Sequence, residues 1–119
     1  MRQLLIALCL LAAAAPAAAQ DRAPPARQGL VDLSYTLGQA HGLAQVCDPD
    51  SQTWRSRMLR MIELEAPDET FRGRLFQAFN TGFSTGQARY PRCSARARAE
   101  LAAVARRGKD LARVIASAR

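Results

Sequence analysis

The chain has 119 residues, with 17 lysine and arginine residues against 10 acidic ones and a formal net charge of +7. This length leads us to expect one small domain, because domains most often have about 100–150 residues. The basic excess is nearly all arginine, which serves solubility and also favours acidic partners or anionic surfaces. No stretch beyond the N-terminus is apolar enough to span a bilayer, so we expect no transmembrane anchor.

The N-terminus is typical of a secretion signal. Arg2 supplies a positive start, residues 4–11 form an apolar run, and residues 17–19 form a small-residue cleavage site. We therefore expect residues 1–19 to be a signal peptide, and the mature protein to be periplasmic or secreted. Nucleic acid is then an unexpected partner, because export separates the protein from it.

Two cysteines, Cys47 and Cys93, remain in the chain after the predicted cleavage. In an oxidising compartment such a pair is expected to form a disulfide. The alternative is a redox or metal site. It is disfavoured because the two cysteines form no CxxC motif and no histidine cluster lies nearby.

Residues 20–28 are polar and proline-rich, which predicts a flexible leader ahead of a helical domain at residues 29–119. Four helices and no strand are expected there, because apolar residues recur at three- and four-residue steps and do not alternate. The first helix should run from about Gly29 to Val46. Its apolar stripe consists of Leu30, Leu33, Leu37, Ala40 and Ala44.

Polar and proline residues mark the ends of the other three helices. Asp50 or Ser51 is expected to cap the second, Pro67 to occupy the first position of the third, and Ser94 to cap the last. Exposed ion pairs are expected on the last helix at four-residue spacing, Arg96 with Glu100 and Arg106 with Asp110. The expected apolar face of the second helix consists of Trp54, Met58, Met61 and Ile62. That of the third consists of Phe71, Leu75, Phe79, Phe83 and Gly86, and that of the last of Leu101, Val104, Gly108, Leu111 and Ile115.

These segments predict an all-α fold, a small up-down bundle of about four helices with one disulfide. In such a bundle the end of the first helix and the start of the fourth lie at the same end. Cys47 belongs to the first of these positions and Cys93 to the second. The predicted disulfide and the predicted topology therefore agree.

Two glycine pairs stand out, Gly38 with Gly42 and Gly82 with Gly86. Each helical glycine costs about 1 kcal/mol in helix propensity, so some compensating contact is expected. One interpretation is close approach of two helices. The other is a groove in which a ligand or partner segment approaches the backbone, with polar groups beside it.

Five residues are candidate binding residues. His41, Asn80 and Tyr90 are the polar groups expected near a glycine-lined groove, although His41 also fits a purely structural position. Trp54 and Arg55 begin the second helix, and an aromatic residue beside arginines is typical of a protein-binding hot spot. The alternative for this helix is an ordinary charged outer face.

No catalytic motif is present in the sequence. Paired glycosidase carboxylates, a Ser-His-Asp set, a phosphate-binding loop and a haem-attachment motif are all missing. We therefore expect no catalytic residue, no metal site and no cofactor, and interpret the protein as a non-enzyme. The alternative is an enzyme without a known motif, centred on His41 and a carboxylate.

Four short motifs in the predicted helices resemble a known family. They are Gly38-Gln39-Ala40-His41 followed by Cys47, Trp54-Arg55-x-x-Met58, Phe79-Asn80-x-Gly82-Phe83, and Tyr90-x-x-Cys93. Across about residues 30–115 the chain resembles a family of small secreted alphaproteobacterial proteins of unknown function. The resemblance implies export and a shared disulfide, and implies no reaction.

Taken together, the sequence favours an exported protein that acts by binding. The partner expected is a cell-envelope protein or an anionic surface polymer, for which the chain would be an accessory factor. The alternative is a periplasmic protein that binds a small ligand or protects other proteins under stress. The sequence does not determine the oligomeric state.

Overall fold

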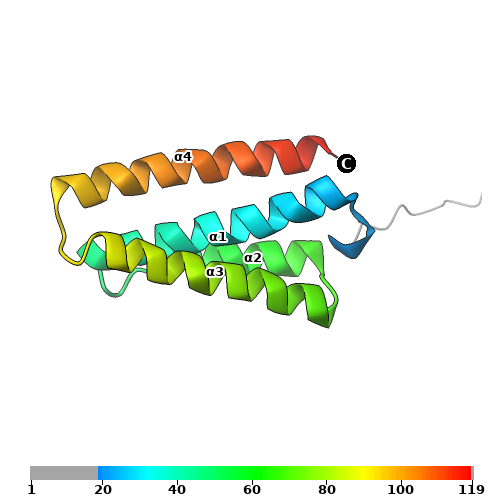
Figure 1. Ribbon diagram of the computed structural model, residues 1–119, viewed down its shortest axis with the longest axis horizontal. Coiled ribbons are helices and arrows are strands. Elements are labelled where there is room, and N and C mark those ends of the chain that lie inside the picture. Colours follow the sequence, from blue (N-terminus) through cyan, green and yellow to red (C-terminus); the bar gives the residue numbers. More distant parts are fainter. Residues whose placement is uncertain (1–18, 119) are drawn as a thin grey trace, which may run out of the picture.

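The chain folds into helices throughout the part that the structure describes. The computed structural model describes residues 19–118, and one turn of 3-10 helix and four α-helices follow one another there without a strand. The predicted all-α bundle is confirmed. The predicted signal peptide lies outside the described residues except for Ala19. The elements are η1 (Ala19–Asp21), α1 (Pro24–Cys47), α2 (Thr53–Glu65), α3 (Glu69–Arg89) and α4 (Ala95–Ser117), as Figure 1 shows.

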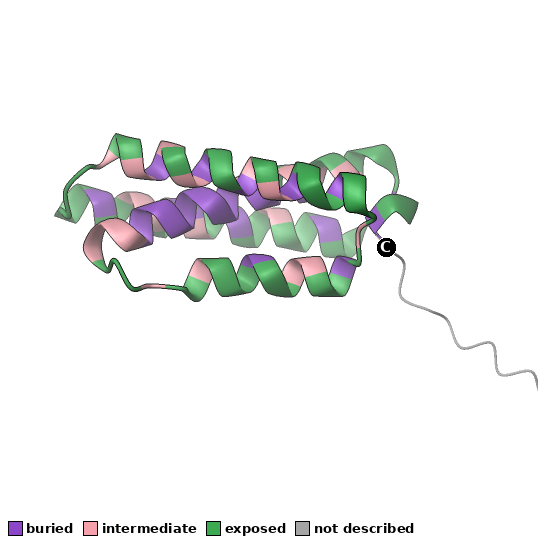
Figure 2. Ribbon diagram, turned by 90° about the horizontal axis from the view of Figure 1, so that it is seen from below, coloured by how far each residue is buried: buried purple, intermediate pink, exposed green. Residues whose placement is uncertain are grey.

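Helix α1 lies at the centre, and the other three helices pack around it. α1 has its closest contacts with α3, and it also packs against α4 and α2, whereas those three helices touch one another little. Between Leu33 and Ala44 every residue of α1 except Tyr35 is buried (Figure 2). The predicted single apolar stripe is therefore too narrow a description, because α1 is covered from three sides.

This central position also buries polar side chains of α1. The hydroxyl groups of Ser34 and Thr36 donate hydrogen bonds to the carbonyl oxygens of Leu30 and Asp32, each at 2.8 Å. Both hydroxyls are thus satisfied by the preceding turn of their own helix, which makes burial tolerable.

The predicted apolar faces of the surrounding helices point toward α1. Met58 of α2, Leu75 of α3 and Val104 of α4 are all almost fully buried. Other members of the predicted faces, such as Phe83, are half-buried because they lie at the edges of the interfaces. The three- and four-residue spacing therefore identified the inner face of each outer helix correctly.

The glycine pairs bring α1 and α3 into backbone contact. A methyl group added at Gly38 would overlap the carbonyl oxygen of Phe79, and one added at Gly82 would overlap that of Tyr35. Gly42 and Gly86 face the opposite helix in the same way. The interpretation as close helix approach is confirmed. A glycine-lined groove is wrong, because each glycine face is filled by the partner helix.

The first helix begins at Pro24, about five residues before the expected position near Gly29. The two prolines at its start have no backbone N–H that would need a partner, and their φ angle is fixed near the helical value. Both properties favour proline in the first turn of a helix. The segment 20–28, expected to be a flexible leader, is therefore partly helical. Within it the side chain of Arg22 is buried.

The helix starts differ from prediction at α2 and α3 and agree at α4. The N-cap of α2 is Gln52 without a side-chain hydrogen bond, because Ser51 closes a turn with its N–H to Asp48 instead of capping. α3 begins two residues after Pro67, and the Asp68 carboxylate accepts a hydrogen bond from the Phe71 N–H at 2.8 Å. The predicted Ser94 cap of α4 is confirmed by its hydrogen bond from the Ala97 N–H.

The two ends of the bundle are fastened in different ways. Cys47 at the end of α1 and Cys93 before α4 form the predicted disulfide, with their Cα atoms 4.7 Å apart. At the opposite end, the Arg22 guanidinium donates two hydrogen bonds of 2.8 Å to the Glu65 carboxylate and one of 3.2 Å to the Ile115 carbonyl oxygen. Arg22 thereby joins the C-terminal ends of α2 and α4, and we call this contact the Arg22 clasp.

Candidate functional site

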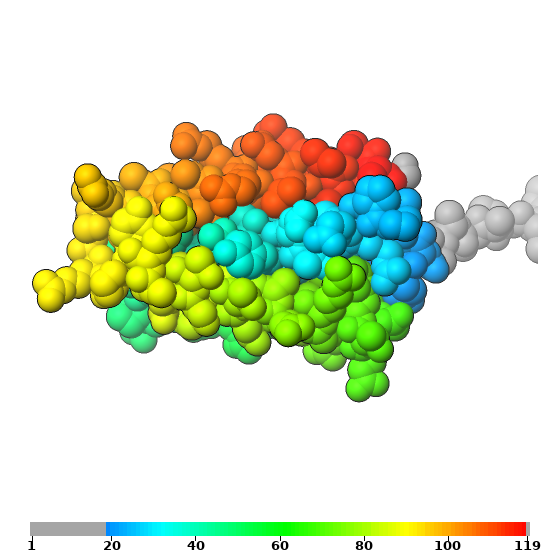
Figure 3. Space-filling view, in the orientation of Figure 1, coloured from blue at the N-terminus to red at the C-terminus, as the bar shows by residue number. Residues whose placement is uncertain are grey.

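Three helices around a fourth do not enclose it fully, and a groove follows each gap. In Figure 3 the surface of α1 is visible between α4 and α3. Each groove has α1 residues in its lining. The grooves enclose about 600 Å³ between α2 and α4, about 650 Å³ between α3 and α4, and about 310 Å³ between α2 and α3.

The groove between α2 and α4, here the α2–α4 groove, has an apolar floor. Leu33 and Leu37 of α1 form its base, and Trp54 of α2 forms part of one wall. The opposite wall comes from α4, whose apolar lining residues are all small. The apolar lining is completed by Met61, Leu64, Ala105, Gly108 and Ala112.

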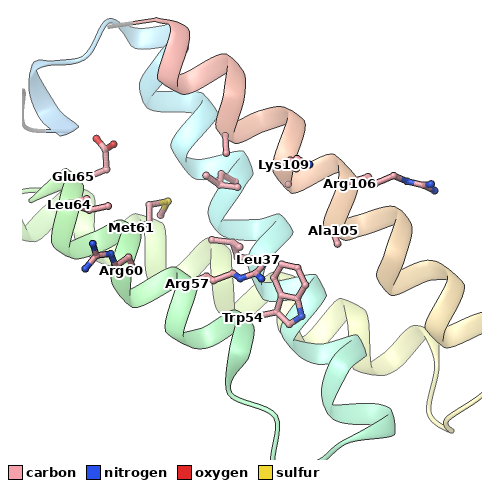
Figure 4. Close-up of a pocket in the computed structure, with 13 residues that line it drawn as sticks. Leu37, Trp54, Arg57, Arg60, Met61, Leu64, Glu65, Ala105, Arg106 and Lys109 are labelled. Carbon is pink, nitrogen blue, oxygen red and sulfur yellow. The ribbon is translucent and has the colours of Figure 1, made fainter.

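Cationic residues from both walls belong to the lining of this groove, and Figure 4 shows that the guanidinium of Arg106 extends away from α2. Arg57 and Arg60 come from α2, and Arg106 and Lys109 come from α4. Glu65 is the one acidic residue among the described residues of the lining, and the Arg22 clasp already engages it. The groove is therefore a positively charged slot with an apolar base.

The cations of the groove keep their charges available for a ligand. The Arg57 guanidinium lies 4.3 Å from the ring centre of Trp54, a cation–π contact that positions the group and does not neutralise it. Arg60 is 4.0 Å from Glu63 in a highly exposed pair, which contributes little. Among the described residues, neither Arg106 nor Lys109 forms an ion pair.

The ion pairs expected on α4 are replaced by others. Asp110 lies 3.9 Å from Arg113 one turn later, and Glu100 lies 3.4 Å from Arg89 of α3. The predicted pairs with Arg96 and Arg106 are therefore wrong, because a closer basic group reaches each carboxylate. For Arg106 the consequence is a position on the rim of the α2–α4 groove.

The smaller cavity between α2 and α3 contains His41. Its imidazole is almost fully buried, with ring centres 5.7 Å from Phe79 and 5.2 Å from Phe83. The Nδ1 atom is buried without a hydrogen-bond partner. Burial, and secondarily the positive charge of Arg55, lowers the pKa of His41 below its ordinary value of 6.5. The imidazole is therefore neutral at pH 7.

The His41 cavity has no carboxylate in its described lining. Arg55, Asn80 and Gln52 are its other polar lining residues. A histidine acting as general base usually needs a group that orients and stabilises it when charged. The neighbouring cation Arg55 has the opposite effect.

The third groove, between α3 and α4, has a mixed polar and apolar lining and is partly filled by its own contacts. Its lining includes Asp32, Tyr35 and Arg74. Arg107 reaches across the groove and donates a hydrogen bond of 3.5 Å to the side-chain oxygen of Gln39. Its lining is more polar than that of the α2–α4 groove, although Val31, Ala78 and Leu111 add apolar surface.

The five candidate binding residues do not form one site. His41, Arg55 and Asn80 line the same cavity, whereas Trp54 belongs to the α2–α4 groove on the other side of α2. Tyr90 packs with the small apolar cluster of Ala40, Leu43 and Val104. Their separation follows from helix geometry, since neighbours in sequence such as Trp54 and Arg55 point about 100° apart.

Sequence reasoning missed the α4 side of the groove and the Arg22 clasp. The available signal on α4 was the small-residue stripe of Ala105, Gly108 and Ala112 beside Arg106 and Lys109. No signal singled out Arg22, because a buried ion pair between residues 43 positions apart depends on the tertiary structure.

The described helices offer neither a membrane span nor a metal centre. No helix in residues 19–118 is long and apolar enough to cross a membrane. Over the same range, no cluster of three or more histidine, cysteine or acidic side chains has the arrangement needed to hold a metal ion.

The fold defines a small disulfide-linked helical protein with an apolar groove that is lined by cationic residues. The chain belongs to a protein family of unknown function, DUF2385, whose model matches residues 25–118. This match confirms the predicted resemblance at the level of a family without known function. The alphaproteobacterial source and the secretion that the resemblance implied remain predictions. No curated protein and no solved structure shows a significant match to the chain.

Proposed function

We propose that the protein is an exported binding protein of the cell envelope that holds an anionic partner in the α2–α4 groove. The observation that supports this most is the combination of four cationic side chains with an apolar floor in one slot. The Cys47–Cys93 disulfide is compatible with an oxidising compartment. Binding without catalysis is part of the proposal, because the buried His41 lacks a carboxylate partner in its cavity.

The groove has the physical features of a binding surface. Apolar surface in its lining, most of all at Leu64, which is 57% exposed, releases water when a ligand covers it, and this favours binding. Arginines at its rim offer planar, bidentate donors for carboxylate or phosphate groups. Trp54 with Arg57 stacked on it adds the residue types that most often dominate interface energetics.

The second candidate function is binding of a small ligand, and the size of the groove favours it. Its volume of about 600 Å³ lies within the range of about 300–1,000 Å³ typical of small-molecule sites. A stress-protective role through opening of a glycine-lined groove loses its basis, because the glycines are covered by helix packing.

Photo-crosslinking in intact cells tests the proposed function. A photoreactive amino acid is placed at Leu64, an exposed residue of the α2–α4 groove, and in a matched variant at Ser84, which is exposed on α3 and lines no described groove. We expect a discrete crosslinked product from position 64 and none from position 84. Equal products from both positions, or none from position 64, would contradict a binding role for the groove.

A further inference from the structure

We propose that the α2–α4 groove binds a single-chain anionic amphiphile, such as a fatty-acid carboxylate or a lysophospholipid. The acyl chain would lie along the apolar floor, and the carboxylate or phosphate would meet the cationic rim. This inference rests on the proposed function and names the chemistry of the ligand.

The shape of the groove suits an elongated apolar group. Its α2 wall extends from Trp54 to Glu65, which is about 16 Å along the axis at 1.5 Å per residue. The α4 wall follows it through Ala105, Gly108 and Ala112, which are small residues at one helix face. The result is a long apolar channel.

The depth of the floor argues against a partner helix. Leu33 and Leu37 are only 8% and 7% exposed, so the walls already cover most of each side chain. A docking helix would need its axis about 8–10 Å from that of α1, with side chains interdigitating across an open face. An unbranched alkyl chain is much thinner than a helix and needs no such open face.

The charges of the rim select the headgroup. The lining contains two α2 cations, Arg57 and Arg60, and two α4 cations, Arg106 and Lys109. Because Glu65 is held by the Arg22 clasp, the slot has a positive field that attracts anions. A wholly polar anionic polymer would use these cations but would leave the apolar floor without a ligand group.

Calorimetric titration of the purified, disulfide-bonded mature protein tests the inference. The probes are oleate, lysophosphatidylglycerol and the uncharged analogue oleyl alcohol, all below the concentrations at which they aggregate. We expect both anionic probes to bind with a stoichiometry of one, and the alcohol to bind at least tenfold more weakly. The tighter of the two anionic probes identifies a free fatty acid or a lipid as the source.

Two double variants with the same change in net charge locate the binding. Arg106→Glu with Lys109→Glu reverses the α4 rim, and Arg96→Glu with Arg98→Glu is the control on exposed residues of the same helix. The rim variant should weaken oleate binding at least tenfold and the control less than twofold. Equal losses in both variants would overturn the assignment, because they would indicate attraction by net charge alone.

Two variants that each add a phenylalanine ring test the apolar part of the site. Ala105→Phe fills the channel, whereas Ala102→Phe places the same ring on the exposed face of α4. Circular dichroism verifies the fold of both. Loss of oleate binding is expected only for Ala105→Phe, and unchanged binding in that variant would contradict the proposal.

The failure of this inference is distinguishable from that of the proposed function. If position 64 crosslinks a protein in cells while neither amphiphile binds the purified protein, the groove is a binding site but the assigned ligand is wrong. Binding of an acidic amphipathic peptide without binding of oleate or lysophosphatidylglycerol also overturns the assignment. If neither crosslinking nor amphiphile binding is found, both proposals fail.

Discussion

His41 shows how one buried residue links pH to the stability of the fold. Its imidazole lies between Phe79 and Phe83, and the one charged group in the described lining of its cavity is the guanidinium of Arg55. Burial and this positive charge both disfavour protonation, so the pKa of His41 is lowered in the folded protein. The unfolded chain carries an ordinary histidine, which binds a proton at higher pH.

We therefore predict that acidification destabilises the protein through His41. Stability should fall as pH decreases through about 6.5, because the unfolded state then takes up a proton that the folded state does not bind. Below the lowered pKa of His41 in the folded protein, both states bind the proton, so this residue no longer makes the stability depend on pH. Urea unfolding of the wild type and of His41→Gln between pH 7.5 and 5.5 measures this. A steeper decrease in His41→Gln than in the wild type would contradict the prediction.

At the scale of elements, the packing of α1 on α3 depends on glycines that let the backbones meet. The four glycines of the two pairs face carbonyl oxygens of the opposite helix. Because these oxygens belong to the backbone, they cannot move aside as a flexible side chain could. This explains why helix-disfavouring residues occur in the centre of both helices. Gly73 of α3 differs, because an added methyl group there would meet no atom within 4 Å.

Gly38→Ala and Gly73→Ala form a matched pair of variants. Gly38→Ala should destabilise the fold by about 1–3 kcal/mol or more, because the two helices must separate to admit the methyl group. Gly73→Ala should stabilise it by up to about 1 kcal/mol through helix propensity. Denaturant titration checks both, and a neutral Gly38→Ala would mean that α1 and α3 are not packed this closely.

The Arg22 clasp joins three elements at the end of the bundle opposite the disulfide. It connects the segment before α1 with the ends of α2 and α4, and both of its charged side chains are less than 10% exposed. Loss of one partner from a buried ion pair is strongly destabilising, because the remaining charge stays in a poorly solvated place. The same contact sets the spacing of α2 and α4 at one end of the α2–α4 groove.

Arg22→Met should therefore lower the free energy of unfolding by about 3–5 kcal/mol. The control Arg113→Met removes an exposed pair and should change it by less than about 1 kcal/mol. Replacing both partners, Arg22→Met with Glu65→Leu, should recover most of the loss in chemical denaturation. A loss as small as that of the control would show that the clasp does not form.

The helices themselves were predictable, whereas their partners and the clasp were not. Apolar spacing and the breaks at Pro49, Pro67 and Pro91 identify four helices, because these signals act within a few residues. The central position of α1 depends on three interfaces at once. A sequence pattern indicates which face is apolar but not how many neighbours cover the helix, so the burial of Ser34 and Thr36 was not predicted.

For the whole molecule, the disulfide and the up-down topology support each other. Cys47 and Cys93 are 46 positions apart and meet at the same end of the bundle, as parity of four helices requires. The candidate site was only partly predictable, because residues that are close in sequence need not belong to the same groove. Trp54 and Arg55 are sequence neighbours but belong to different grooves, and Arg106 was expected to be neutralised by Asp110.

Removal of the disulfide should be costly for a domain of this size. In the chain-entropy view, closing a loop of 46 residues stabilises a fold by about 4 kcal/mol. The double variant Cys47→Ser with Cys93→Ser should lose a comparable amount in urea unfolding, and reduction of the wild type should have the same effect. A variant as stable as the oxidised protein would contradict this account.

The packing of three helices around α1 creates three grooves, and the central claim is that the ligand binds in the α2–α4 groove and not in the other two. Side-chain N–H groups report on each groove, Trp54 for the α2–α4 groove, Gln39 for the α3–α4 groove and Asn80 for the His41 cavity. Two-dimensional ¹H–¹⁵N NMR of the oxidised protein during titration with oleate reads all three together. We predict saturable shifts of the Trp54 indole and of the Gly108 amide, with the Gln39 and Asn80 amides unchanged. Shifts centred on Gln39 or Asn80, or spread equally over all three grooves, would contradict the account.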